Sequence, residues 1–396
     1  MPPKVDIIES CKVVPHDETP KHRLWLSNLD IFAPMAHVST ILKNTLSKVL
    51  VTFYPLAGRL VFDRDGRPEV DCNAEGVLFS VAHADCTVDG LLTLFKCGGV
   101  CLGCALHHSF TDGVSAPHFI NAWSEISRGL DIISVPPFLD HTVLHAPSPP
   151  KVSFDHIEYT NDGIYTTPTS PPPDDLVRLE ECETAILTIS KDQLDTLKYG
   201  FDGERNLSTF KAVAVHVWRT ACKARELLHK QYTRFFLASD VRARLKPPLP
   251  MGYLGNAIMR ISCHLRVGDL VSKPLELGVS RIEETIKSLD DEYIRSLVDL
   301  LEMVEGEKRK AWVSKNIKMT DLVLISWLAL PLYEADFRWG KPWFIGNASL
   351  RLPGQAFAMH SGSRNSGGVS VTIAFESADM ARFKEIFYRD LDSQAV

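Results

Sequence analysis

The 396-residue sequence has no apolar run long enough to cross a lipid bilayer, so it predicts no membrane span. Its first residues, Met1 to Asp6, lack the apolar core of a secretory leader, and this predicts a cytoplasmic protein. Positive charge is not in excess: the net charge of −6 excludes the basic surface that nucleic acid or an anionic membrane would attract. The nine cysteines are odd in number and scattered, which predicts reduced thiols and no disulfide framework.

The rest of the composition, 45% apolar and 23% charged, is that of an ordinary soluble globular protein. A chain of this length predicts two domains. Prolines gather between Val135 and Asp175 and exclude a helix or a central strand there. We therefore expect a proline-rich crossover (135–183) that joins an N-terminal domain (1–165) to a C-terminal domain (184–396). Expected strands and helices alternate along both, which predicts an α/β fold with mixed β-sheets.

A strand, a turn and a helix form the first candidate for chemistry. The apolar run Val100–Leu106 predicts a buried strand, after which come His107, His108, Asp112 and Gly113. Apolar residues at helical spacing follow the glycine. His108 is the candidate general base, because a neutral imidazole accepts a proton near pH 7, and Asp112 would hold the ring or the turn. The alternative is a core histidine with satisfied hydrogen bonds, since one His-x-x-x-Asp is expected by chance in a chain with 14 histidines.

The same stretch contains Cys97, Cys101 and Cys104 beside the two histidines, a composition that could suggest zinc. Most of these cysteines lie inside the apolar run, where a free thiol packs as a small hydrophobe. A structural zinc site normally takes its ligands as two pairs from separate turns, whereas these residues lie in one continuous stretch. We therefore predict no metal.

Several stretches together resemble the plant BAHD acyltransferases, which use acyl-CoA donors. They are His108-Ser-Phe-Thr-Asp112-Gly113, Tyr54-Pro-Leu-Ala-Gly-Arg59, Asp240-x-Arg242-x-Arg244 and Asp336-Phe-Arg-Trp-Gly340. Further stretches are similar to hydroxycinnamoyl-CoA transferases of the shikimate/quinate type, namely His118–Trp123, Arg128–Asp131, Pro136–Asp140 and His156–Tyr159. The resemblance covers almost the whole chain.

This resemblance implies two chloramphenicol-acetyltransferase-like domains with an active-site channel between them. It implies a monomer with acyl-CoA as co-substrate, a small-molecule acceptor and no permanently bound cofactor. His108 would deprotonate an alcohol or amine acceptor, which then attacks the thioester and receives a hydroxycinnamoyl-type group. Asp112 would mainly shape the turn. Asp336 would be a structural residue paired with Arg242, and Trp339 a structural residue of the same motif.

Other site residues are expected on weaker grounds, because capping, loop geometry or strand packing would explain each as well. For CoA they are Ser208, Lys211, Tyr253 and Gly255. For the acceptor pocket they are His37, Thr40, Trp312, Ser326 and Trp327.

Three departures from the family pattern stand out. Arg338 replaces the first glycine of Asp-Phe-Gly-Trp-Gly, and strains the turn if that position has a positive φ. The chain is short between Thr40 and Leu42 and between Asp89 and Leu91. Trp312 stands where shikimate-type members have an arginine for the acceptor carboxylate, which argues against shikimate.

Two other functions stay open. A catalytically impaired, acyltransferase-like binding protein is favoured by the short segments and by Arg338. A condensation-domain-like, amide-forming enzyme also fits the stretch His107–Gly113, although Tyr54–Arg59 and Asp336–Gly340 argue against it.

Overall fold

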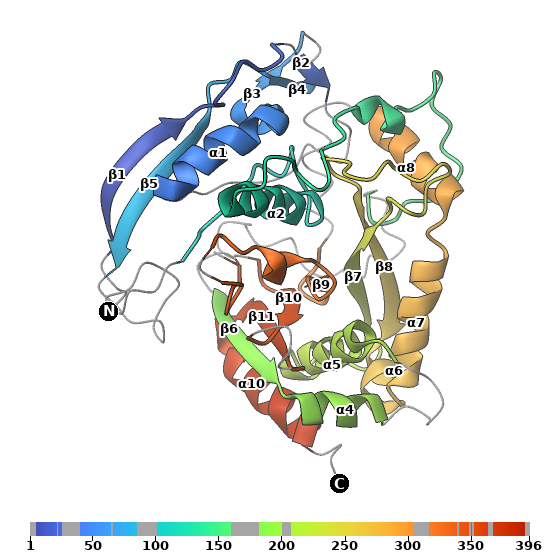
Figure 1. Cartoon of the computed structure of the whole chain (residues 1–396). Helices are drawn as coiled ribbons and strands as arrows, with labels where there is room; N and C mark the ends of the chain where they lie inside the picture. Colours follow the sequence, from blue (N-terminus) through green and yellow to red (C-terminus); the bar gives the residue numbers. More distant parts are fainter. Residues whose placement is uncertain are drawn as a thin grey trace. The chain divides into compact units, whose positions relative to one another are not determined.

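The structure is a computed structural model, and its secondary structure is shown in Figure 1. It describes residues 5–21, 23–25, 40–64, 66–84, 101–159, 182–199, 207–304, 317–338, 340–347, 350, 352–362 and 367–392. The chain forms two compact units. Unit 1 comprises Met1–Pro149 with two later stretches, Pro247–Ile258 and Pro331–Pro342, and unit 2 comprises the rest.

The two later stretches of unit 1 lie inside the part of the sequence predicted as the C-terminal domain. Each therefore leaves the neighbouring strands of unit 2 along the chain and returns to them. The predicted domain boundary near residue 165 lies outside the described residues and stays a prediction. The predicted channel between the domains concerns the placement of one unit against the other, and it stays a prediction too.

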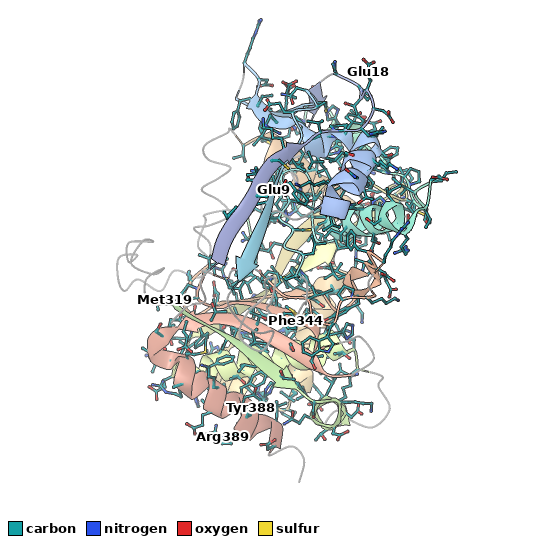
Figure 2. All side chains as sticks on the ribbon, turned by 60° about the vertical axis from the view of Figure 1, so that its left-hand side comes forward. Glu9, Glu18, Met319, Phe344, Tyr388 and Arg389 are labelled. Atoms are coloured by element: carbon teal, nitrogen blue, oxygen red, sulfur yellow. The ribbon has the colours of Figure 1, made fainter. Side chains whose placement is uncertain are left out.

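The described residues of unit 1 form two small sheets and two α-helices. Its elements are β1 (Val5–Val13), β2 (Arg23–Trp25), α1 (Thr40–Thr52), η1 (Tyr54–Ala57), β3 (Arg59–Phe62), β4 (Pro68–Asp71), β5 (Val77–Ala84), α2 (Ser115–Arg128), η2 (His141–Leu144) and η3 (Leu332–Glu334). Strands β1 and β5 pair antiparallel, while β2, β4 and β3 form an antiparallel three-stranded sheet. In Figure 2, Glu9 marks β1.

The core of unit 1 lies where α1 meets α2. Phe53 after α1 packs edge-on against Phe119, with ring centroids 5.4 Å apart. The indole of Trp123 donates to the hydroxyl of Thr45 at 3.0 Å, so the buried N–H is satisfied. Leu254 and Phe337, one from each later stretch, belong to the same apolar cluster. The burial of these two side chains therefore holds both stretches on unit 1.

In its described residues, unit 2 has a mixed sheet of six strands in the order β6-β11-β10-β9-β7-β8. The strands are β6 (Cys182–Ile189), β7 (Tyr232–Asp240), β8 (Ile258–Arg266), β9 (Leu322–Ser326), β10 (Gln355–His360) and β11 (Val369–Glu376). Strand β9 is parallel to β7 and β10, whereas β11 is antiparallel to β10 and β6. The predicted α/β class with a mixed sheet is confirmed.

Helices α5 and α10 pack on each other and against strands of this sheet (Figure 1). In the described residues, the helices of unit 2 are α4 (Lys191–Tyr199), α5 (Thr209–Ala224), α6 (Val267–Ser272), α7 (Glu276–Lys287), α8 (Asp291–Glu302) and α10 (Ser377–Asp392). Phe383 and Phe387 on the inner face of α10 are buried, while Arg389 is largely exposed (Figure 2). None of the helices in the described part of the chain is long and apolar enough to cross a membrane.

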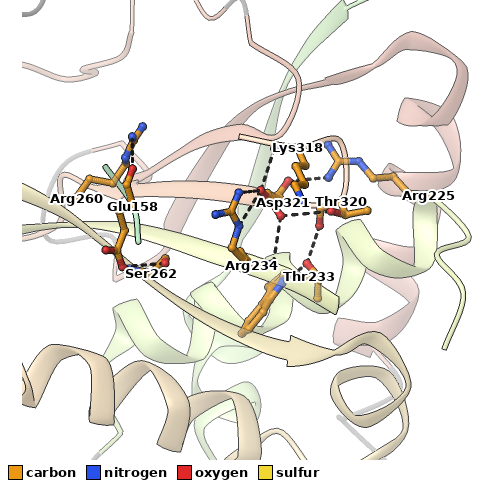
Figure 3. A network of polar contacts seen from close by, with 10 residues as sticks. Glu158, Arg225, Thr233, Arg234, Arg260, Ser262, Lys318, Thr320 and Asp321 are labelled. Atoms are coloured by element: carbon orange, nitrogen blue, oxygen red, sulfur yellow. Dashed lines mark hydrogen bonds and ion pairs between the residues drawn. The ribbon is translucent and has the colours of Figure 1, made fainter. Parts of the chain in front are cut away.

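A buried ion pair joins β7 to the start of β9 (Figure 3). The guanidinium of Arg234 donates to Asp321 at 2.8 Å, and the amide of Lys318 and the hydroxyl of Thr320 also donate to this carboxylate. Because Asp321 is only 2% exposed, these donors replace the water that its charge would otherwise require.

From Pro150 to Tyr159 the crossover belongs to unit 2. Glu158 accepts from the amide of Ser262 at 2.8 Å and from its hydroxyl at 2.9 Å (Figure 3). Burial lowers the pKa of His156 to about 4, so this imidazole is neutral beside the hydroxyl of Ser296. The stretch His156–Tyr159 thus has a structural role here.

One predicted element is wrong. The described residues of the expected strand Val100–Leu106 are irregular, apart from an isolated bridge at Ala105, and none of the described sheets includes them. Gly103 interrupts the run, and glycine weakens a strand because it loses more conformational entropy and offers no side chain to pack. The helix expected after Gly113 is present as α2, and its C-cap is Gly129, whose φ of 91° is left-handed.

Candidate active site

Asp112 organises the turn that leads into α2. One carboxylate oxygen accepts from the amides of Val114 and Ser115, both at 2.9 Å. The other accepts from the amide of Ala257 at 2.8 Å. Asp112 is 2% exposed, so these charge-assisted bonds satisfy a buried carboxylate and two amides at the start of a helix. This geometry supports the expectation that Asp112 shapes the turn.

The loop 247–258 lies against this turn and contributes three successive contacts to it. The amide of Gly255 donates to the hydroxyl of Ser115 at 3.0 Å. Asn256 contacts His108, and Ala257 contacts Asp112. On the other side of the loop, the amide of Leu254 donates to the carbonyl of Phe138 at 3.0 Å.

Both polar atoms of the Asn256 side-chain amide form hydrogen bonds with His108. Its Nδ2 donates to the backbone carbonyl of His108, a group that can only accept. The amide oxygen Oδ1 is therefore the atom that lies 2.9 Å from Nδ1 of the imidazole. Since Oδ1 can only accept, Nδ1 must carry the proton in the neutral ring, and Nε2 keeps its lone pair.

In this tautomer, Nε2 of His108 is the nitrogen that can accept a proton. No hydrogen bond reaches this nitrogen from the part of the chain that the structure describes. The side chain is exposed, in contrast to the buried Asp112 and Asn256 that hold it. A rigid, oriented imidazole with one unoccupied nitrogen can take a proton from a bound hydroxyl or amine.

His107 has a different environment from His108. Its Nδ1 accepts from the amide of Ser109 at 3.2 Å, and its ring packs edge-on against Phe110. Burial, and to a smaller extent the adjacent His108, lower the pKa of His107. It is a neutral, packed residue of the turn.

The four residues predicted to bind CoA each contact other residues of the chain. Ser208 caps α5 by accepting from the amide of Lys211, whose ammonium pairs with Glu283 at 2.7 Å. Tyr253 is 2% exposed, and its ring centroid lies 5.4 Å from that of His141 at a tilted angle, while Gly255 contacts Ser115. A role in CoA binding stays a prediction for these four residues.

The residues predicted for the acceptor pocket are only partly described. His37 and Trp312 lie outside the described residues, as does Trp339, and Thr40 begins α1. Ser326 ends β9, and the amide of Trp327 donates to the carbonyl of Ala358 at 2.8 Å. Their role at the acceptor stays a prediction.

The predicted pair of Asp336 and Arg242 would join the two units and stays a prediction. Within unit 1, Asp336 accepts from the amides of Arg338 at 2.9 Å and Gly340 at 3.1 Å. Within unit 2, Arg242 donates to Asp240 at 3.0 Å. Among the described residues, no group of three histidine, cysteine, aspartate or glutamate side chains could hold a metal ion.

Asn256 and Ser115 are the residues whose roles the sequence does not reveal. Asn256 is separated from His108 by 148 positions, and the sequence predicts only CoA binding for the loop that contains it. The sequence offers one signal for Asn256, a polar residue directly after a glycine, and this signal does not identify the residue that it contacts.

The Transferase family profile matches residues 3–94 and 90–390. The chain is 39% identical to putrescine hydroxycinnamoyltransferase 1 of Oryza sativa subsp. japonica, over 457 aligned residues that cover 98% of this chain and 99% of the relative. It is 37% identical to shikimate O-hydroxycinnamoyltransferase of Nicotiana tabacum, with coverage of 97% and 99%. The first alignment is longer than the 396-residue chain, so that relative contains segments that this chain lacks.

Among solved structures, vinorine synthase is similar, with a TM-score of 0.72 and 22% identity. The match covers 96% of each chain. This likeness shows the fold, and it agrees with the chloramphenicol-acetyltransferase-like arrangement that the sequence led us to expect.

Arg338 has the strained backbone that its substitution for glycine led us to expect. Its φ is 81°, a left-handed value that costs a non-glycine residue about 1 kcal/mol. The guanidinium rests on Gly129: its Nη2 lies 2.8 Å from the point that a Cβ on this glycine would occupy. A cation there also complements the C-terminal end of α2.

We predict that Arg338→Gly is more stable than Arg338→Ala by about 1 kcal/mol, because both lose the guanidinium but only glycine removes the strain. The free energies of unfolding of the two variants in urea provide the comparison. An alanine variant as stable as the glycine variant would show that the turn is not strained.

Proposed function

Because the chain belongs to the Transferase family, the BAHD acyltransferases, we propose that His108 is the general base of a hydroxycinnamoyl-CoA-dependent transfer to a neutral alcohol or an amine. The enzyme is an acyl-CoA-dependent O/N-acyltransferase. The observation that carries the proposal is the contact with both ends of the Asn256 amide, which leaves Nε2 of His108 as the unprotonated nitrogen.

The proposed reaction begins with proton transfer to Nε2 of His108. Nε2 takes the proton of the acceptor hydroxyl or amine as its oxygen or nitrogen attacks the thioester carbonyl. The tetrahedral intermediate collapses, the carbon–sulfur bond breaks, and the CoA thiolate leaves with the proton that Nε2 holds. Meanwhile the Nδ1–H of the imidazolium keeps its bond to the oxygen of Asn256, which stabilises the charged ring. Holding both reactants at one base supplies much of the rate.

The family match argues against the condensation-domain-like alternative. The alternative of a catalytically impaired binding protein rests partly on Arg338, so the distance of this residue from His108 bears on it. Arg338 contacts the C-terminal end of α2 at Gly129, whereas Asp112 and the His108 turn lie at its N-terminal end. A 14-residue helix is about 20 Å long, so the strained turn is remote from the base. This supports an active enzyme.

The nature of the acceptor is proposed from the sequence. Trp312 occupies the place of the arginine that would pair with a carboxylate, and an unpaired carboxylate is costly to desolvate. The similar rice protein is named for putrescine, an amine. The monomeric state and the cytoplasmic location stay predictions.

We predict that His108→Ala lowers kcat at least about a hundredfold, because the proton acceptor is lost. His107→Ala, the matched control one residue away, loses far less. Transfer from p-coumaroyl-CoA is measured for both variants, and calorimetry checks that the thioester still binds. An alanine variant at position 108 with more than about a hundredth of the wild-type rate contradicts the general-base role.

We also predict a higher kcat/KM for an aliphatic alcohol or for putrescine than for shikimate, with p-coumaroyl-CoA as the donor throughout. An indole in place of the arginine offers no charge to the shikimate carboxylate. If shikimate is clearly preferred, the assignment of Trp312 to that position is wrong.

A further inference from the structure

Ser115 is completely buried at the first position of α2, and its hydroxyl is directed to the loop 247–258. The hydroxyl accepts from the amide of Gly255 at 3.0 Å, and it lies 2.9 Å from the carbonyl of Gly255 and 3.1 Å from that of Tyr253. Three polar groups of the loop backbone therefore meet at one side chain.

The contact between Ser115 and Gly255 lies directly beside Asn256 in the loop. Gly255, Asn256 and Ala257 are consecutive, and they contact Ser115, His108 and Asp112 in that order. Ser115 and Asp112 hold the residues on either side of Asn256, so together they fix where its amide meets the imidazole. We name these three contacts the 255–257 clasp.

We propose that Ser115 is a positioning residue for His108, which acts through the 255–257 clasp by keeping Asn256 on Nδ1 of the ring. The inference rests on the proposed function of His108 as the base. Without the Ser115 hydroxyl, the amide of Gly255 loses this acceptor in a site that excludes water, and such a loss destabilises the local geometry. Once Asn256 shifts, the ring is free to carry its proton on Nε2, and in that form Nε2 cannot accept the proton of the acceptor.

Ser127 provides a matched control on the same helix. It is also buried, at 2% exposed, and its hydroxyl donates to Thr45 in the core of unit 1. Ser115→Ala and Ser127→Ala each remove one buried hydroxyl from α2, but only the first removes a contact of the clasp. Ser115→Cys keeps a similar shape with weaker hydrogen bonding, and it serves if the alanine variant does not fold.

The test observes the tautomer of His108 directly, by proton–nitrogen correlation NMR of protein labelled at histidine, with His108→Gln to assign the signal. We expect the proton on Nδ1 in the wild type and in Ser127→Ala, and a measurable Nε2–H population in Ser115→Ala and, to a smaller extent, in Ser115→Cys. In parallel, kcat of Ser115→Ala falls about tenfold or more with KM for p-coumaroyl-CoA within twofold, while Ser127→Ala keeps its kcat.

Two outcomes overturn the inference: a Ser115 variant that keeps the wild-type tautomer, or Ser127→Ala that shifts it equally. Failure of the proposed function looks different. In that case the tautomer responds to Ser115 as stated, but the wild-type protein transfers no acyl group from any CoA donor tested.

Discussion

The hydrogen bonds between the Asp112 turn and the loop 247–258 are the constraint on which the site depends. A buried carboxylate must be fully hydrogen-bonded, and Asp112 meets this need with amides from two distant segments, 114–115 and 257. The same requirement brings Asn256 to His108. The polar groups that keep the turn from unfolding are thus also those that set the protonation of the base.

Helix α2 connects this constraint to the rest of unit 1. Its N-terminal end receives the loop 247–258, and its C-terminal end receives the stretch 331–342, where Arg128 donates to the carbonyl of Asp336 at 2.7 Å. Phe337 packs edge-on against Trp123 of the helix, with ring centroids 5.1 Å apart. Contacts from two distant segments therefore fix both ends of α2, and this rigid helix supports the turn on which His108 lies.

Much of this arrangement could be predicted from the sequence, because local patterns carry it. The spacing of apolar residues predicts α2, and the prolines predict the irregular crossover. The strand expected at Val100–Leu106 is absent from the described residues, and the sequence could not reveal this, because an apolar run does not show whether a neighbouring strand exists to pair with it. The partner of His108 was hidden because a contact across 148 positions leaves no local trace.

The central claim is that the Asn256 amide makes His108 a base by holding the proton on Nδ1. The most direct measurement is kcat of Asn256→Leu with p-coumaroyl-CoA and the best acceptor, because leucine has nearly the same size but neither accepts nor donates. The account predicts a loss of about a hundredfold or more, as an imidazole in the wrong tautomer cannot take the proton. A kcat within threefold of the wild type would contradict it.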